Sequence, residues 1–174
     1  MSRDPQPAGL GAGSAQRLPH WPYLQAVDEA LTGRGIPPGT VRADRTYPRH
    51  GDTMYLVLVW DVSRTGGVGG LRLNWEEDRG WSYALLWVSP SIATPTQPLA
   101  ALHRVFAAPD DVAAVAEHLV RDWRTPTGEY GAEWDQATHV RATIERFRAT
   151  VRKPGGLWTG AEDEDLWNPQ PRLG

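Results

Sequence analysis

No cysteine occurs among the 174 residues of the sequence. This absence excludes disulfides, thiolate metal sites, iron–sulfur clusters and cysteine nucleophiles. Long apolar runs are missing as well, because none approaches the roughly 20 residues that a membrane-spanning helix requires. Residues 1–18 also lack the apolar segment of a secretion signal. We therefore expect a cytoplasmic protein that has no membrane partner.

An excess of basic residues is lacking too, since 18 Lys and Arg stand against 21 Asp and Glu, for a formal net charge of -3. Sequence-independent attraction to nucleic acid needs a basic surface. A nucleic-acid partner is therefore disfavoured, unless a local basic face provides that surface.

Signatures of catalysis are also missing. None of the five histidines forms the HExxH arrangement of a zinc site, and no GxSxG nucleophile motif is present. The glycine-rich stretch 66–70 precedes a strand pattern, whereas a phosphate-binding loop precedes a helix. We predict no catalytic residue, metal site or cofactor. A small enzyme that uses His and carboxylate residues is the main alternative to a binding protein.

Composition divides the chain into three parts. Residues 1–18 are rich in Gly, Pro, Ala and Ser and have no periodicity, which predicts a flexible tail. Residues 19–153 have enough apolar residues for one core and are predicted to form a single domain. Residues 154–174 are predicted to form an acidic, Trp-containing C-terminal tail.

Helical and strand periodicities are both present in the central part. Apolar residues at helical spacing predict helices over about residues 22–33, 109–123 and 134–151. Alternation, or β-rich composition, predicts strands over 53–61, 69–77 and 81–88, and a further strand over 41–47. Residues 89–98 contain three prolines and are predicted to be a loop.

These elements predict an α+β fold, in which an antiparallel sheet of three to five strands packs against two or three helices as a two-layer sandwich. The sheet contains a hairpin that turns at Asp78-Arg79-Gly80, with Gly80 in the left-handed conformation. This turn predicts that Trp75 pairs with Tyr83. The face that carries Leu71, Leu73 and Trp75 is predicted to be core, together with most of the tryptophans.

Three groups of residues are candidates for partner binding. Glu76, Glu77 and Asp78 form an acidic hairpin tip, which is also the pattern of a simply solvated turn. The basic face of the third helix carries Arg141, Arg148 and Arg152. The tail holds the acidic run 162–165 between two Leu-Trp pairs: Leu157, Trp158, Leu166 and Trp167.

The acidic tail has two interpretations. It is tethered next to the basic helix and could fold back on it at a high effective concentration. Alternatively, it is a short linear motif for another protein, because Trp and Leu anchors among acids are typical of segments that become ordered on binding.

Four segments together carry a family resemblance: 20–31, 44–51, the hairpin Trp75 to Trp81, and 109–113. They resemble an actinobacterial, streptomycete family defined only as a domain of unknown function, over about residues 20–123. The resemblance implies an actinobacterial cytoplasmic protein and carries over no catalytic residue. By fold analogy, a curled antiparallel sheet between helices is similar to small secretion-chaperone-like domains that bind other polypeptides.

The preferred prediction is a non-enzymatic protein-interaction or regulatory module. Its partner is another protein, and a homodimer formed through the sheet is a second option. Nucleic-acid association through the third helix is the third prediction, after the small enzyme.

Overall fold

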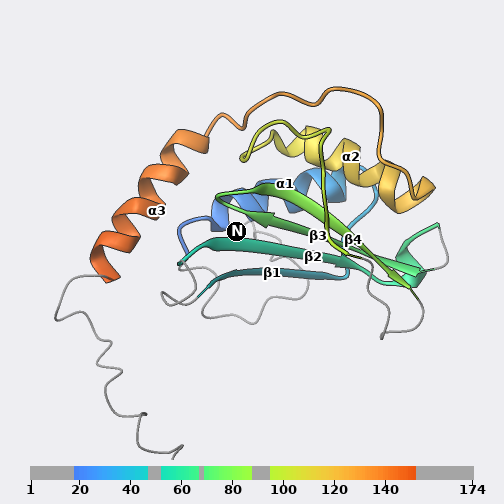
Figure 1. The fold of residues 1–174 in the computed structure, drawn as a ribbon, viewed down its shortest axis with the longest axis horizontal. Helices are drawn as coiled ribbons and strands as arrows, with labels where there is room; N and C mark the ends of the chain where they lie inside the picture. The colour runs from blue at the N-terminus through green and yellow to red at the C-terminus, as the bar shows by residue number, and fades with distance from the viewer. Residues whose placement is uncertain (1–17, 47–51, 67–68, 88–94, 152–174) are drawn as a thin grey trace, which may run out of the picture.

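Five strands form one antiparallel sheet in chain order (Figure 1). The computed structural model describes residues 18–46, 52–66, 69–87 and 95–151. Each strand pairs with the next one along the chain. The strands are β1 (Thr40–Arg45), β2 (Met54–Trp60), β3 (Gly69–Glu76), β4 (Gly80–Trp87) and β5 (Gln97–Pro98).

Alternation along the strands gives the sheet one apolar face. On β2 every second side chain, from Met54 to Trp60, is fully buried, and the residues between them are half-buried. On β3 the same period buries Leu71, Leu73 and Trp75. The predicted core face is therefore confirmed, because successive side chains of a strand point to opposite sides of the sheet.

The β3–β4 hairpin turns where the sequence predicts it, but its register differs. Gly80 has a φ of +79°, as expected for the left-handed residue of this turn. The Arg79 amide donates to the Glu76 carbonyl at 3.2 Å, which closes the turn one residue early. Trp75 therefore pairs with Trp81 rather than with Tyr83. The predicted pairs were wrong, although the same residues still share one face.

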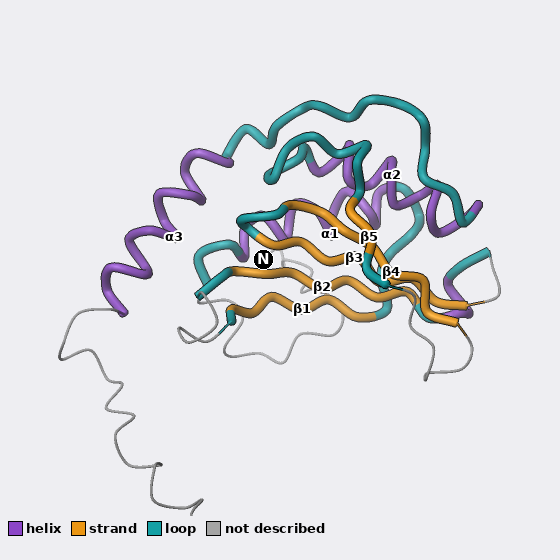
Figure 2. Tube along the Cα trace, viewed as in Figure 1, coloured by secondary structure: helices purple, strands orange, loops and turns teal. Residues whose placement is uncertain are grey.

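Two helices, α1 (Trp21–Gly33) and α2 (Pro109–Asp122), lie side by side on the apolar face (Figure 2). Both carry proline in the first turn, where its missing N–H has no helical partner to lose. α2 has Asp110 and Asp111 in its first turn, where their negative charges interact favourably with the positive end of the helix dipole.

Aromatic rings fill the space between helices and sheet. Tyr23 of α1 contacts four rings, those of Trp75, Trp81, Phe106 and Trp134, at centroid distances of 5.0–6.1 Å. Its hydroxyl donates to the Ala107 carbonyl at 2.8 Å and accepts from Trp81 Nε1 at 3.0 Å. The Tyr23 hydroxyl and the Trp81 indole N–H are thus both paired inside this apolar cluster. Burial raises the pKa of Tyr23 far above its usual range.

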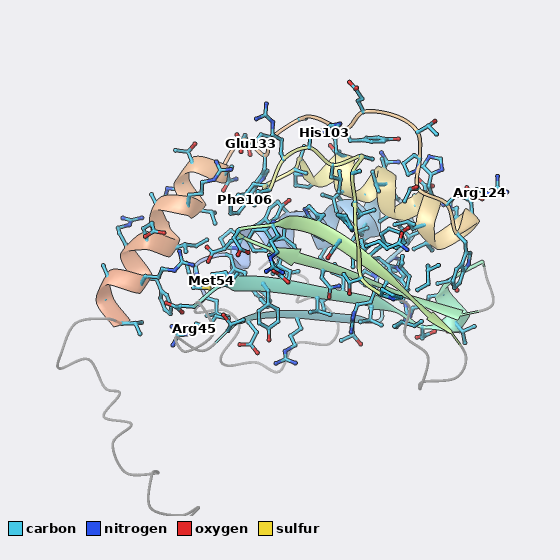
Figure 3. The ribbon with its side chains drawn as sticks, in the orientation of Figure 1. Arg45, Met54, His103, Phe106, Arg124 and Glu133 are labelled. Atoms are coloured by element: carbon cyan, nitrogen blue, oxygen red, sulfur yellow. The ribbon has the colours of Figure 1, made fainter. Side chains whose placement is uncertain are left out.

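The third helix, α3 (Ala137–Val151), lies apart from the other two, at the hairpin end of the sheet (Figure 1). It begins three residues after the predicted start at 134, and it buries Ala137, Val140 and Ile144. Figure 3 shows Arg45 and Met54 beside it, with Arg124 at the opposite end of the molecule.

Two further predictions can be compared with the structure. The predicted loop 89–98 contains the two-residue strand β5, which pairs with β4, so this part of the prediction was wrong. The predicted tail 1–18 lies outside the described residues except for Leu18, and the predicted tail 154–174 lies entirely outside them. No described helix has the length and apolar character that spanning a membrane would take.

Candidate binding face of the sheet

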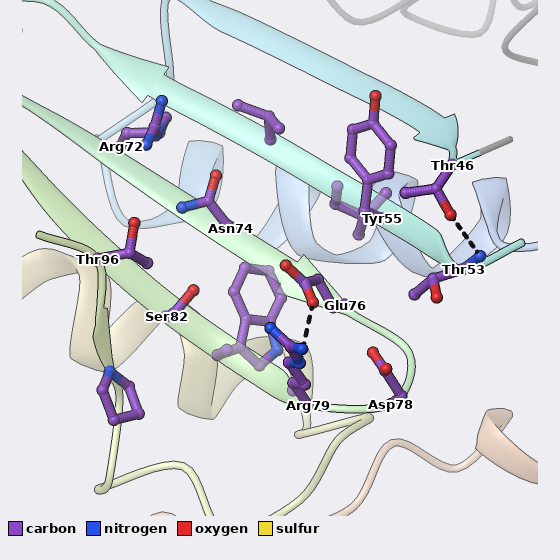
Figure 4. A pocket seen from close by; sticks show the side chains of 15 residues that line it. Thr46, Thr53, Tyr55, Arg72, Asn74, Glu76, Asp78, Arg79, Ser82 and Thr96 are labelled. Atoms are coloured by element: carbon purple, nitrogen blue, oxygen red, sulfur yellow. Dashed lines mark hydrogen bonds and ion pairs between the residues drawn. The ribbon is translucent and has the colours of Figure 1, made fainter. Parts of the chain in front are cut away.

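The second face of the sheet has no helix on it within the described part of the chain (Figure 4). Its residues come from the strand positions that alternate with the core. From β2 these are Tyr55, Val57 and Val59, which are half-buried. The neighbouring strands add a polar stripe and a small apolar patch: Arg72, Asn74, Glu76, Ser82, Ala84 and Leu86.

A groove of about 980 Å³ lies on this face, and we call it the sheet groove. It reaches from the end of β1 across the sheet to β5 (Figure 4). Its lining residues are Thr46, Thr53, Tyr55, Leu56, Val57, Arg72, Asn74, Glu76, Asp78, Arg79, Gly80, Trp81, Ser82, Thr96 and Pro98. The size is that of a pocket for a small ligand or for a few residues of a peptide.

Strand register sets the order of groups across the groove. One row runs Arg42, Val57, Asn74, Ser82, Pro98 across all five strands. The next row toward the hairpin contains Tyr55 and Glu76, and the next row away from it contains Val59 and Arg72. The groove therefore has amide and hydroxyl groups at its centre, with Tyr55 and Glu76 on one side and Arg72 on the other.

Arg72 is the basic residue of this face that lies farthest from the hairpin. Its Nε atom is buried, and within the described residues it has no hydrogen-bond partner. Arg72 as a whole is half-buried, and no ion pair joins it to a carboxylate among the described residues. An anion that reached the outer part of the guanidinium would form a charge-assisted hydrogen bond with it. Arg72 is thus suited to hold a carboxylate or phosphate oxygen.

The hairpin end of the groove carries negative charge. Glu76 forms an ion pair of 3.6 Å with Arg79, and Asp78 lies next to them (Figure 4). Four residues along β3 separate Arg72 from Glu76, or about 13 Å at the usual strand rise. The groove is therefore positive near one end and negative near the other, as a directional ligand such as a peptide would require.

The lining of the groove contains few of the residue types that act as catalytic bases. Among the described residues that line it, none is His, Cys or Lys, so Ser82 and the threonines have no neighbouring base of that kind. The described residues also contain no group of three or more His, Cys, Asp or Glu that could hold a metal ion.

The predicted acidic tip and the predicted basic helix face each other. Arg148 of α3 forms ion pairs with Glu77, with Asp52 at 3.9 Å and with Glu145 at 2.8 Å, and only 15 % of its side chain is exposed. It also donates to the Asp52 carbonyl at 2.8 Å. Glu77 in turn accepts from the Met54 amide at 3.1 Å. Arg148 and Glu77 are thus used within the chain, and they fasten α3 to the sheet.

Arg141 is also engaged within the chain. It pairs with Glu133 at 2.6 Å, and its guanidinium lies 4.9 Å from the centre of the Phe106 ring. Its side chain remains 46 % exposed. The other predicted binding residues, Arg152, Leu157, Trp158, Leu166 and Trp167, lie outside the described residues.

Sequence reasoning assigned Arg72, Asn74 and Ser82 to the face opposite the core but gave them no function. One signal could have found them: β2 is apolar at both parities, through Tyr55, Val57 and Val59 as well as through its core residues. A strand with that pattern is typically covered on both faces. Here one of the two faces has no described helix on it.

The fold and the groove define a class: an α+β protein whose antiparallel sheet is covered by helices on one face and carries a groove on the other. A family of unknown function, DUF6292, matches residues 23–118. This span is more than half of the 174 residues, and the chain belongs to that family. No curated protein and no solved structure matches the chain. The matched span contains most of α1, all five strands and most of α2, so it includes the sheet groove.

Proposed function

We propose that the protein is a non-enzymatic interaction module that binds a segment of another polypeptide in the sheet groove. The observation that carries this proposal is the half-buried second face of β2, where Tyr55 and Val57 line the groove together with Arg72, which has no ion pair among the described residues. Apolar contact area would supply the binding free energy, and the guanidinium would select an acidic residue of the ligand.

A polypeptide is favoured over a small molecule by the shape and chemistry of the groove. The groove is an open trough along the sheet, and its central row offers the side chains of Asn74 and Ser82 to a peptide backbone. Its charges change sign along β3, from Arg72 to Glu76. Small-molecule pockets are more often enclosed and mainly apolar.

Several finer expectations are proposals of the same kind. They are an actinobacterial, streptomycete source, a cytoplasmic location, a regulatory role and a homodimer formed through the sheet. The Ala, Gly, Pro and Arg bias of the composition supports the first of them. The small enzyme and the nucleic-acid protein rank lower, because the groove lining has no His or Lys and Arg148 is engaged within the chain.

The test is a selection of peptides from a displayed random library on the immobilised full chain, followed by calorimetry with a selected synthetic peptide. Val57→Asp places a charge in the groove, and we expect it to weaken binding at least about tenfold, or about 1.4 kcal/mol. Val62→Asp is the matched control, because Val62 is 51 % exposed and lies outside the groove lining. Its binding should be unchanged.

The charge is tested in the same way. Arg72→Gln should weaken binding of acidic peptides, whereas Arg124→Gln, at an exposed position far from the groove, should not (Figure 3). Circular dichroism checks that each variant is folded. Equal affinity of the selected peptide for the Val57→Asp, Arg72→Gln and unaltered chains would show that the groove is not the binding site.

A further inference from the structure

The acidic tail and the sheet groove are chemically complementary. Residues 162–165 are Glu-Asp-Glu-Asp, between the pairs Leu157-Trp158 and Leu166-Trp167. The groove contains the guanidinium of Arg72, whose buried Nε has no partner among the described residues, and apolar surface from Tyr55, Val57 and Pro98. Acids would pair with the guanidinium, and the Leu and Trp side chains would cover the apolar surface.

The last described residues of the chain lie at one end of this groove. Near the end of α3, the Phe147 ring lies 5.2 Å from the Arg45 guanidinium, and Arg148 donates to the Asp52 carbonyl. Thr46 follows Arg45 in the chain and Thr53 follows Asp52, and both threonines line the groove (Figure 4). The Thr53 amide donates a 2.8 Å hydrogen bond to the Thr46 hydroxyl. Val151 is one helical turn beyond Phe147, so residue 152 starts near the groove.

The length of the tail is sufficient. Arg72 pairs with Val59, six residues along β2 from Thr53, which places it about 20 Å from that end of the groove. Seven extended residues, from Val151 to Trp158, span about 23 Å, and eleven, from Val151 to Glu162, span about 36 Å. Both a Leu-Trp pair and the acidic run can therefore reach Arg72.

The basic helix competes poorly for the same segment. Arg141 and Arg148 already pair with carboxylates of the domain, namely Glu133, Glu77, Asp52 and Glu145. An acidic segment that docked on α3 would have to displace or share those ion pairs. Arg72 offers its charge without that competition.

We propose that the C-terminal segment 157–167 of this chain occupies the sheet groove and regulates access to it. This inference rests on the proposed function, because it takes the groove as the polypeptide-binding site. Tethering raises the effective concentration of the segment to the millimolar range. A partner must then displace the segment, and the partner that fits best carries an acidic run next to Leu or Trp.

The test uses the full chain and its lack of cysteine. Thr159→Cys gives a single attachment point for a nitroxide spin label between Trp158 and the acidic run. We expect amide signals of Asn74 and Ser82 in the groove to lose most of their intensity, and the signal of His118 on the helix side to keep it. Arg72→Gln should restore the groove signals, and the matched variant Arg124→Gln should not.

A mixed sample distinguishes the tail of the same chain from the tail of a second copy. It contains spin-labelled chain without ¹⁵N and ¹⁵N-enriched chain without the spin label. Loss of the groove signals in that mixture would mean that the tail of a second copy binds there, and the intrachain proposal would be overturned. Intact groove signals in the singly labelled chain would overturn it as well.

A peptide titration separates this failure from failure of the proposed function. The full chain with Glu162→Gln, Asp163→Asn, Glu164→Gln and Asp165→Asn is titrated with the library-selected peptide. If the tail occupies the groove, the neutralised chain should bind that peptide at least about tenfold more tightly than the unaltered chain. Equal affinities overturn the tail proposal and leave groove binding intact. Absence of groove shifts in either chain overturns both.

Discussion

At the scale of single residues, His20 is a polar side chain that the fold has removed from water. It is fully buried, and its ring stacks on Trp75 at a centroid distance of 6.0 Å. Nε2 lies 3.1 Å from the Tyr55 carbonyl and must be the donor, because a carbonyl oxygen only accepts. Nδ1 is buried and has no partner among the described residues. Burial lowers the pKa of His20 from 6.5 to about 4.

This lowered pKa predicts a loss of stability in mild acid. Between pH 6.5 and about 4 the unfolded chain binds the proton and the folded chain does not, so the free energy of unfolding falls as the pH falls. From pH 7 to 4.5 the loss due to His20 is about 2 kcal/mol. Urea unfolding at pH 7 and at pH 4.5 measures this loss in the free energy of unfolding. The variant His20→Gln keeps a donor for the Tyr55 carbonyl and should remove the part of the loss that is due to His20.

His118→Gln is the control, since His118 is half exposed on α2 and pairs only with Asp122 among the described residues. This variant should keep the loss of stability in acid that is due to His20. Parallel stability curves for the unaltered chain and His20→Gln would contradict the prediction.

At the scale of elements, α3 depends on Arg148 for its attachment. The helix lies outside the family match, which ends at residue 118. Arg148 joins it to Glu77 of the hairpin and to Asp52 before β2, whose side chains are 12 % and 6 % exposed. Removing the cation takes this partner from Glu77 and leaves Asp52 with Arg45 at 3.3 Å. Because Asp52 keeps that partner, we expect a cost of about 2 kcal/mol, below the roughly 3–5 kcal/mol of a fully broken buried pair.

Arg148→Gln should therefore loosen α3 without unfolding the sheet. Hydrogen exchange of residues 137–151 should become about ten times faster or more, because opening costs less, while exchange in β2 and β3 stays slow. Arg146→Gln is the matched control on the same helix, since Arg146 is exposed and bonds the Thr143 hydroxyl. Unchanged exchange in α3 would show that its apolar residues alone hold it.

At the scale of the whole molecule, one apolar cluster joins the elements. It includes residues of α1, of β1 to β4, of α2 and of α3, with Tyr23, Trp75 and Phe106 near its centre. Because no element has a core of its own, loss of one part exposes the rest.

We therefore predict a single cooperative thermal transition. The near-ultraviolet circular dichroism of the packed tryptophans and the far-ultraviolet signal of the backbone should have the same midpoint. Leu58→Ala, at a fully buried position, should lower both midpoints together, as expected for a core truncation that costs about 2–5 kcal/mol. Separate midpoints would show independent units.

The sequence was sufficient for the elements and for the buried face of the sheet. The periods 3.6 and 2 are properties of neighbouring residues, so they predicted three helices, four of the five strands and the parity of Trp75 and Trp81. β5 was missed because two residues are too few to show a period. The hairpin register was missed because one hydrogen bond, from the Arg79 amide, decides it.

Tertiary structure alone decided which charged residues remain unpaired and which face has a groove. Arg148 and Asp52 are 96 residues apart, and no local pattern shows that they meet. Arg72 looks in sequence like any solvated strand residue. That its Nε has no partner among the described residues depends on where distant parts of the chain lie. Periodicity indicates which side chains of a strand can be buried. Where the helices lie on the sheet, and which face they therefore leave open, depends on packing between residues that are distant in sequence.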